Sequence, residues 1–215
     1  VQARSSTGPP GALRGRVPPA PAGTSGQVSQ QELLTEVLRA LNSLGTPYML
    51  TGSIVSSMQG EPRATHDLDV VVVLDAADVE RVVGASPPPR YYVDAVDARE
   101  SVLRQSMFNV IDMADGGKAD FWMLTSEPFD LPRFARRRRE TLFGVPAYLS
   151  SAEDTILAKL RWSRLSGGSE KQFGDALRVY EVQRPGLDLR YLEAWVEELG
   201  VRDLWSRLLA EAVEG

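Results

Sequence analysis

An Asp-x-Asp pair opens an apolar run of this chain and sets the first limit on its fold. Asp67 and Asp69 lead into residues 70–74, which are rich in valine and predict a buried strand. Residues i and i+2 of a strand point to the same face, so the two carboxylates lie side by side. Burying like charges among valines is costly, and a divalent cation is the usual compensation. Hard carboxylate oxygens favour Mg²⁺ or Mn²⁺, so the pair predicts a metal site.

A Gly-Ser pair precedes this strand, with thirteen residues between Ser53 and Asp67. Residues 47–51 predict a short strand, and residues 54–59 predict a short helix directly after the pair. Gly52 would let the backbone approach a ligand closely. Ser53 would stand at the helix N-terminus, where free N–H groups and the helix dipole favour phosphate. The two motifs together predict a phosphate cradle beside a metal pair.

Two further apolar segments, residues 107–112 and 118–124, flank an Asp-Gly-Gly sequence. Asp-Gly-Gly is a strong turn signal, so the pattern predicts a β-hairpin. Each strand carries one aspartate that is a candidate third carboxylate, Asp112 in the first strand and Asp120 in the second. A lone strand aspartate can also be a solvated edge residue, so the pattern alone leaves both open.

The remaining patterns predict an α+β fold, with a mixed sheet, helices against it and a C-terminal helical bundle. Residues 1–26 are rich in Pro and Gly and contain no acidic residue, which predicts a disordered tail. We expect one domain over residues 27–149 and the helical bundle over residues 150–215. Ligand sites often lie between domains, so we expect the active site in the cleft between these two.

Three charged residues outside the motifs are candidates for this cleft. Lys159 lies at the margin of the buried stripe of a helix predicted over residues 154–164, where it can snorkel to solvent or meet a phosphate in the cleft. Asp175 falls on the polar face of the next predicted helix. Arg63 lies in the loop before the Asp-x-Asp strand, and an ordinary surface arginine is an equal alternative there.

The composition excludes several functional classes. The chain has no cysteine, which excludes disulfides and thiolate metal sites and fits a reducing cytoplasm. No apolar run approaches the ~20 residues of a membrane span. The single histidine, His66, excludes histidine-rich zinc sites, and we expect it to lie near bound nucleotide or to be solvated. The net charge is −5 although residues 1–26 are basic, which argues against a broad nucleic-acid surface.

Five arginines fall within residues 133–139. One interpretation is a nucleic-acid contact. We favour a helix whose exposed C-terminal turn carries cations that complement its dipole, because the rest of the domain is acidic. A third interpretation is that one or two of these arginines face a triphosphate or an anionic acceptor.

The order of Gly-Ser, Asp-x-Asp and a third strand carboxylate resembles the nucleotidyltransferase superfamily of DNA polymerase β, in its small bacterial and archaeal minimal branch. The resemblance covers about residues 30–212. Residues 118–121 resemble a "basic, apolar, Asp, apolar" stretch of this branch, which favours Asp120 over Asp112. Residues 153–162 and 171–177 resemble two helices of the branch, and abortive-infection toxin nucleotidyltransferases have a lysine and an aspartate related to those found there.

The resemblance implies transfer of a nucleoside monophosphate from a nucleoside triphosphate to a hydroxyl of a protein, an RNA or a small molecule, with release of pyrophosphate. It implies Mg²⁺ or Mn²⁺ as cofactor. The implied catalytic residues and metal ligands are Asp67, Asp69 and Asp120. The implied nucleotide-binding residues are Gly52, Ser53, Arg63, Lys159 and Asp175.

The resemblance further implies a cytoplasmic protein with no membrane or DNA partner, and it suggests a toxin–antitoxin setting with a small helical antitoxin. The alternative is a catalytically silent module that binds nucleotide or a partner, as an antitoxin would. Three carboxylates kept together on buried strands argue against a silent scaffold. Nucleotidylation of an antibiotic ranks lower, because no residue pattern identifies an aminoglycoside pocket.

Overall fold

The computed structural model describes residues 25–65 and 67–212, so the predictions for His66 and for the first 24 residues lie outside the described part. The strands are β1 (Tyr48–Thr51), β2 (Asp67–Val72), β3 (Tyr91–Tyr92), β4 (Met107–Asp112), β5 (Lys118–Met123), β6 (Arg138–Leu142) and β7 (Val145–Leu149). The helices are α1 (Ser25–Leu44), α2 (Gly52–Gln59), α3 (Ala76–Gly84), α4 (Ala95–Arg104), α5 (Asp130–Ala135), α6 (Ala152–Leu165), α7 (Glu170–Gln183), α8 (Leu189–Glu198) and α9 (Arg202–Glu211), with a 3₁₀ turn at Arg184–Gly186.

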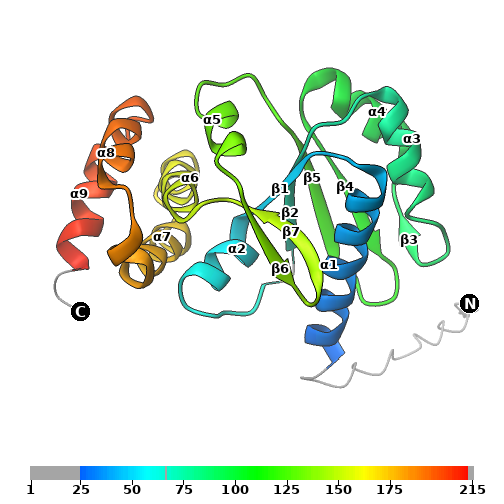
Figure 1. Ribbon diagram of the computed structural model, residues 1–215, viewed down its shortest axis with the longest axis horizontal. Coiled ribbons are helices and arrows are strands. Elements are labelled where there is room, and N and C mark those ends of the chain that lie inside the picture. Colours follow the sequence, from blue (N-terminus) through cyan, green and yellow to red (C-terminus); the bar gives the residue numbers. More distant parts are fainter. Residues whose placement is uncertain (1–24, 66, 213–215) are drawn as a thin grey trace, which may run out of the picture.

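Over these two ranges the strands form one mixed sheet in the order β3-β4-β5-β2-β1-β7-β6 (Figure 1). β1 and β2 are antiparallel, β2 and β5 are parallel, and β4 and β5 form the expected antiparallel hairpin. The predicted α+β fold with helices after the sheet is therefore confirmed. None of the helices in the described ranges is both long and apolar enough to cross a bilayer.

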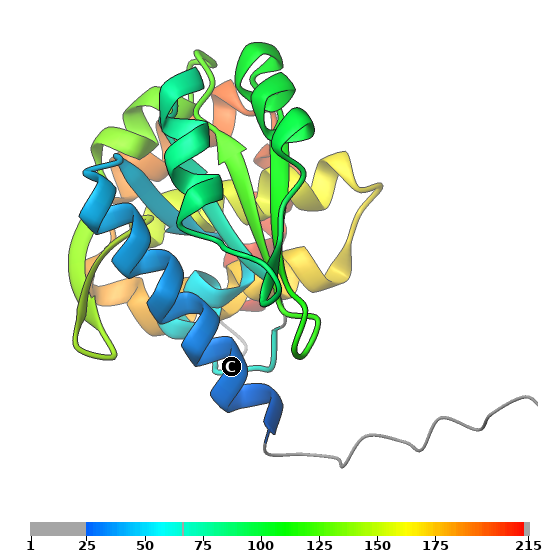
Figure 2. The same ribbon diagram turned by 90° about the vertical axis from the view of Figure 1, so that its right-hand side faces the viewer.

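The alternation of side chains along β2 divides the sheet into an apolar face and a carboxylate face. Leu68, Val70 and Val72 point into a hydrophobic core that α1, α3 and α4 cover. Asp67 and Asp69 have the opposite parity and point away from that core. Figure 2 shows α1 and α3 in front of the sheet, with α6 and α7 beyond it.

The helical part has its own hydrophobic core, built from α6 to α9. Figure 1 shows α8 and α9 at the end of the molecule far from α1. α2 connects this part to the sheet. The Gln59 amide donates to the Ser150 carbonyl at 2.7 Å, and the Gln183 amide donates to the Gln59 carbonyl at 2.7 Å. A Cβ on Gly60 would lie 2.9 Å from the backbone of Arg178 and Val179, so α7 lies directly against the end of α2.

The arginine run forms the helix turn that we favoured only in part, with Arg133 in the last turn of α5 and Arg136 at its C-cap. α5 ends at Ala135, and Arg138 and Arg139 lie exposed on β6, the edge strand of a hairpin. Arg138 and Arg139 belong to a strand because the tight turn at Phe143-Gly144 reverses the chain and pairs β6 with β7. Both turn residues have positive φ. Charged residues on an exposed edge strand also discourage pairing with another chain.

Candidate functional site

The sheet register places Asp69 between the predicted third carboxylate, Asp120, and the residue that precedes the Gly-Ser pair, Thr51. Asp69 is the register partner of Asp120 across β2 and β5, and of Thr51 across β1 and β2. Gly52 follows Thr51 directly and begins α2. The predicted phosphate cradle and two of the three predicted carboxylates therefore meet on one face of the sheet.

Asp112 does not join them. On β4 it has the parity of Phe108 and Val110, which point into the core, whereas Asn109 is the register partner of Asp120. Asp112 is buried, and its carboxylate accepts two hydrogen bonds from the Arg90 guanidinium, each 3.2 Å long. Its charge is thus compensated within the protein, away from the other carboxylates.

We call Asp67, Asp69, Asp120 and Lys118 the carboxylate cluster. Lys118 Nζ lies 3.0 Å from Asp120 Oδ2 and 4.0 Å from Asp67 Oδ1. The Asn109 amide donates to Asp120 Oδ1 at 2.6 Å, and the Trp122 indole donates to Asp69 Oδ1 at 3.2 Å.

Burial raises the pKa of Asp69, the bond from Trp122 lowers it, and the charge of Asp120 raises it again. The pKa of Lys118 is raised, chiefly by its hydrogen bond to Asp120. Asp69 therefore carries its charge at an electrostatic cost, and one ammonium group offsets the cluster only in part.

The donor set of the carboxylate cluster fits a hard divalent cation. All three acids offer carboxylate oxygens from neighbouring strands, the ligands that Mg²⁺ and Mn²⁺ prefer. Within residues 25–65 and 67–212, however, no three acidic, histidine or cysteine side chains converge on one metal position. Asp67 is exposed and Lys118 lies between it and Asp120, so the predicted ligands are neighbours that do not yet point to a common centre.

Gly52 brings the helix N-terminus into direct contact with Asp69. Its φ is +70°, and a Cβ there would lie 1.9 Å from Asp69 Oδ2. The space beside Asp69 therefore exists only because residue 52 has no side chain. The Thr51 side chain does not cap α2, so it leaves the first backbone N–H groups of the helix open to an anion.

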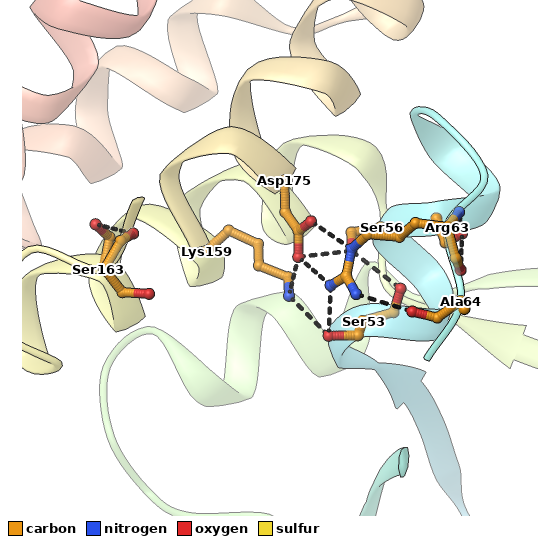
Figure 3. Close-up of polar contacts among 9 residues, drawn as sticks. Ser53, Ser56, Arg63, Ala64, Lys159, Ser163 and Asp175 are labelled. Carbon is orange, nitrogen blue, oxygen red and sulfur yellow. Dashed lines mark hydrogen bonds and ion pairs between the residues drawn. The ribbon is translucent and has the colours of Figure 1, made fainter. Parts of the chain in front are cut away.

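A second group of charges lies between α2, α6 and α7 (Figure 3). It consists of Arg63, Lys159 and Asp175, and we call it the Asp175 cluster. Arg63 reaches Asp175 from one side, with Nε–Oδ1 at 2.8 Å and Nη2–Oδ2 at 2.7 Å. Lys159 reaches it from the other side, with Nζ–Oδ2 at 2.8 Å. Both cations also contact Ser53 Oγ, Arg63 Nη2 at 2.9 Å and Lys159 Nζ at 3.4 Å. The structure thus brings four predicted nucleotide-binding residues together.

Asp175 lies on the polar face of α7, as predicted, and this face is buried rather than exposed to solvent. Only 9% of its side chain is exposed, because this face of α7 packs against α2 rather than against solvent. Burial alone would raise its pKa, but the hydrogen bonds from Arg63 and Lys159 outweigh burial and hold the pKa below its usual value. Burial lowers the pKa of Lys159, and Asp175 opposes that shift.

A cavity of about 580 Å³ lies between the sheet and α6 and α7. Its wall includes Gly52, Ser53, Asp69 and Lys159, so parts of both clusters face the same space. Arg63 and Asp175 are outside the cavity wall and contact its lining residues Ser53 and Lys159.

Sequence reasoning did not anticipate several residues around this space. Trp122, Trp162 and Arg161 also line the cavity. Lys118 was noted only as part of a motif, although its i+2 spacing to Asp120 was a usable signal that both side chains share one face. Trp162 follows Lys159 by one helical turn, which was a similar signal.

The arginine run has several environments. Arg133 lines the cavity and pairs with Asp130 at 3.1 Å. The Arg136 guanidinium lies 3.8 Å from the centre of the Tyr191 ring. Arg137 packs on Phe134, with 4.2 Å to the ring centre. These three side chains are held by partners within the protein, so the run does not make one continuous basic surface.

No protein-family model and no curated protein sequence matches the chain. The solution structure of the antibiotic-resistance factor ANT(2'')-Ia is similar, with a TM-score of 0.51 and 12% identity over 87% of this chain and 99% of that one. Its crystal structure with adenylyl-2''-tobramycin gives 0.54 and 12% identity over 81% and 98%. An antigenic nucleotidyltransferase-like protein from Paracoccidioides brasiliensis gives 0.54 and 17% over 86% and 94%. At these identities the similarity concerns the fold.

Proposed function

The chain has the polymerase β-like nucleotidyltransferase fold, and from this premise we propose that it transfers a nucleoside monophosphate from a nucleoside triphosphate to a hydroxyl group. The observation that carries the proposal is the contact between Gly52 and Asp69, because it sets an open helix N-terminus against a carboxylate. A phosphate bound at the helix N-terminus would lie beside the Asp69 carboxylate. That carboxylate could hold a metal ion that also contacts the phosphate.

In this proposal the β- and γ-phosphates bind at Gly52 and Ser53, with the Lys159 ammonium as counter-charge. Arg63 and Asp175 position Ser53 and Lys159 from behind the cavity wall. An ammonium already held by a buried carboxylate loses less side-chain freedom when a phosphate arrives, which lowers the entropic cost of binding.

The carboxylate cluster would hold Mg²⁺ or Mn²⁺ through Asp67, Asp69 and Asp120, and the bound metal supplies charge neutralisation for the phosphates and for the attacking oxygen. During transfer, the acceptor oxygen bonds to the α-phosphorus and the bond from that phosphorus to the bridging oxygen of pyrophosphate breaks. The Asp120 carboxylate takes the acceptor's proton. Lys118 must release Asp120 for this role, which its partial exposure to solvent permits.

The acceptor in this proposal is a protein, an RNA or a small molecule, and the small-molecule class has the precedent of ANT(2'')-Ia in complex with adenylyl-2''-tobramycin. The setting we propose is cytoplasmic, without membrane or DNA partner, and paired with a small helical antitoxin. A neighbouring gene for such a protein would support the pairing.

One observation favours the second candidate, a silent nucleotide-binding module. Lys118 occupies the position between Asp67 and Asp120 that a metal would use, so the protein already offers a cation there. In that case the protein binds triphosphate at Gly52, Ser53 and Lys159 without transferring it.

Label transfer tests the proposal. The protein is mixed with Mg²⁺ or Mn²⁺, an α-³²P-labelled nucleoside triphosphate and a cell extract, and labelled products and pyrophosphate are measured. We expect transfer by the wild type and by Asp112→Asn, and none by Asp69→Asn or Asp120→Asn, with folding checked by circular dichroism. Binding without transfer would favour the silent module. Neither binding nor transfer with any of the four nucleotides would refute the proposal.

A further inference from the structure

Trp162 exposes a large aromatic ring inside the cavity. Its exposed fraction is 48%, although burial of an indole is among the larger hydrophobic gains available to a fold. It lies on α6, three residues after Lys159 and therefore roughly 4.5 Å further along the helix axis. An exposed indole in a concave wall, one turn from a cation, is placed to contact a ligand that the cation also holds.

Trp162 does not stand alone. Its ring meets that of Trp122 edge-on, with 6.2 Å between ring centres and 60° between ring planes. The Trp122 indole N–H in turn donates to Asp69 Oδ1 at 3.2 Å. The two indoles thus make a continuous aromatic wall in the cavity lining, from Asp69 on β2 to Trp162 on α6, which we call the Trp122–Trp162 wall.

We infer that the Trp122–Trp162 wall is the platform for the nucleobase, with the base stacked on Trp162. The inference rests on the proposed function, which sets the β- and γ-phosphates at Gly52 and Ser53 and a metal ion at the carboxylates. The reacting α-phosphate then lies beside Asp69, the carboxylate that faces the cavity. The ribose and base continue from the α-phosphate, and the wall begins at the same carboxylate. The base therefore lies along the Trp122–Trp162 wall, on the side of Asp69 towards Trp162.

Stacking has a consequence for nucleotide preference. Every base has a π face, so an aromatic platform accepts all four bases. A purine overlaps more of the indole than a pyrimidine does, and the attraction grows with overlap. ATP and GTP therefore bind more tightly than CTP and UTP.

The test compares ATP with inorganic triphosphate, which carries the phosphates without a base. Affinities are measured by titration calorimetry in Mg²⁺ for the wild type, Trp162→Ala and Trp162→Phe. Trp162→Ala should weaken ATP binding about 5- to 150-fold, which corresponds to 1–3 kcal/mol per stacked base, and leave inorganic triphosphate unchanged. Trp162→Phe should retain most of the ATP affinity.

Two further variants serve as controls. Leu189→Ala removes a similarly exposed apolar side chain, 49% exposed, from α8 outside the cavity, and should change neither affinity. Lys159→Met should weaken both ligands. Equal losses of ATP and inorganic triphosphate in Trp162→Ala, or no loss of either, would overturn the inference while the proposed function stands. A wild type that binds neither ligand would overturn both.

Discussion

The two charged clusters differ in how their charges are compensated. In the Asp175 cluster one carboxylate is held by two cations, with contacts of 2.7–2.8 Å. The carboxylate cluster has three acids and one ammonium group, Lys118, which lies 3.0 Å from Asp120 and 4.0 Å from Asp67. The first cluster has an excess of positive charge and the second an excess of negative charge. In our proposal each cluster binds a ligand of the opposite sign, a phosphate at the first and a divalent cation at the second.

The pKa shifts express the same difference. The pKa of Asp175 is lowered because its hydrogen bonds outweigh burial, so its charge stabilises the fold at neutral pH. That stabilisation is present above the unfolded pKa and is lost as the pH falls through the folded pKa. The pKa of Asp69 is raised by burial, so its charge destabilises the fold as the pH rises through that pKa. The charge of Asp175 therefore stabilises the folded state, whereas the charge of Asp69 destabilises it.

The largest effect is expected from Asp175→Asn, which removes the shared acid and leaves Arg63 and Lys159 facing each other. We expect a loss of about 3 kcal/mol in the free energy of unfolding, the lower end for a broken buried ion pair, because Arg63 is partly exposed. Chemical denaturation measures it. Inorganic triphosphate should restore part of the loss, since it binds only the folded state.

Glu181→Gln is the matched control, because it breaks an exposed ion pair with Arg178 on the same helix. Such a pair contributes about 0–1 kcal/mol. Equal losses in Asp175→Asn and Glu181→Gln would remove the distinction between the Asp175 cluster and an ordinary surface pair.

Gly52→Ala should have the next largest effect, because it closes the contact between the helix and Asp69. A left-handed φ costs a non-glycine residue about 1–2 kcal/mol, and here the added Cβ also collides with Asp69 Oδ2. Gly45→Ala isolates the collision, since Gly45 has a φ of +68° and nothing within 4 Å of its Cβ position. Thermal melting and ATP titration should show a stability loss in both variants and a loss of ATP affinity only in Gly52→Ala. Retained ATP affinity in Gly52→Ala would place the phosphates elsewhere.

Asp69→Asn should have the smallest effect and the opposite sign. It removes a charge that the metal-free fold carries at a cost, while the amide oxygen can still accept the Trp122 hydrogen bond. We expect the free energy of unfolding to rise by about 1 kcal/mol at neutral pH, within the range of single stabilising substitutions, or the melting temperature by about 2–4 °C. The gain should shrink as the pH falls through the raised pKa of Asp69, because the wild-type carboxyl then becomes neutral. A loss of stability at neutral pH would mean that Asp69 supports the fold as Asp175 does.

Local sequence determined much of the fold and part of the site. The Gly-Ser pair, the Asp-x-Asp strand and the Asp-Gly-Gly hairpin each follow from residues close together in the chain, and the structure has all three elements. The contact between Asp112 and Arg90 also reflects a readable pattern, since the parity of β4 sends Asp112 to the core side.

Long-range packing accounts for what the sequence did not predict. The periodicity of α7 marks one apolar face, and nothing local indicates that α2 covers Asp175 on the other side. Arg63 and Asp175 are 112 residues apart in the chain. The β6–β7 hairpin was missed because its first strand is mostly charged and exposed, which is the pattern of an edge strand rather than of a buried one.

The place of α2 between the sheet and α7 has a consequence for the order in which the protein becomes competent during synthesis. Ser53 and Arg63 leave the ribosome long before Asp175, and the carboxylate that holds Arg63 and Lys159 arrives only with α7. A nascent chain can complete its sheet before Asp175 is available to hold Arg63 and Lys159, the cations that we propose bind phosphate. If the proposed function holds, competence to bind nucleotide arises late, when the helical part closes onto α2, and an incomplete chain carries the proposed catalytic carboxylates without a complete nucleotide site.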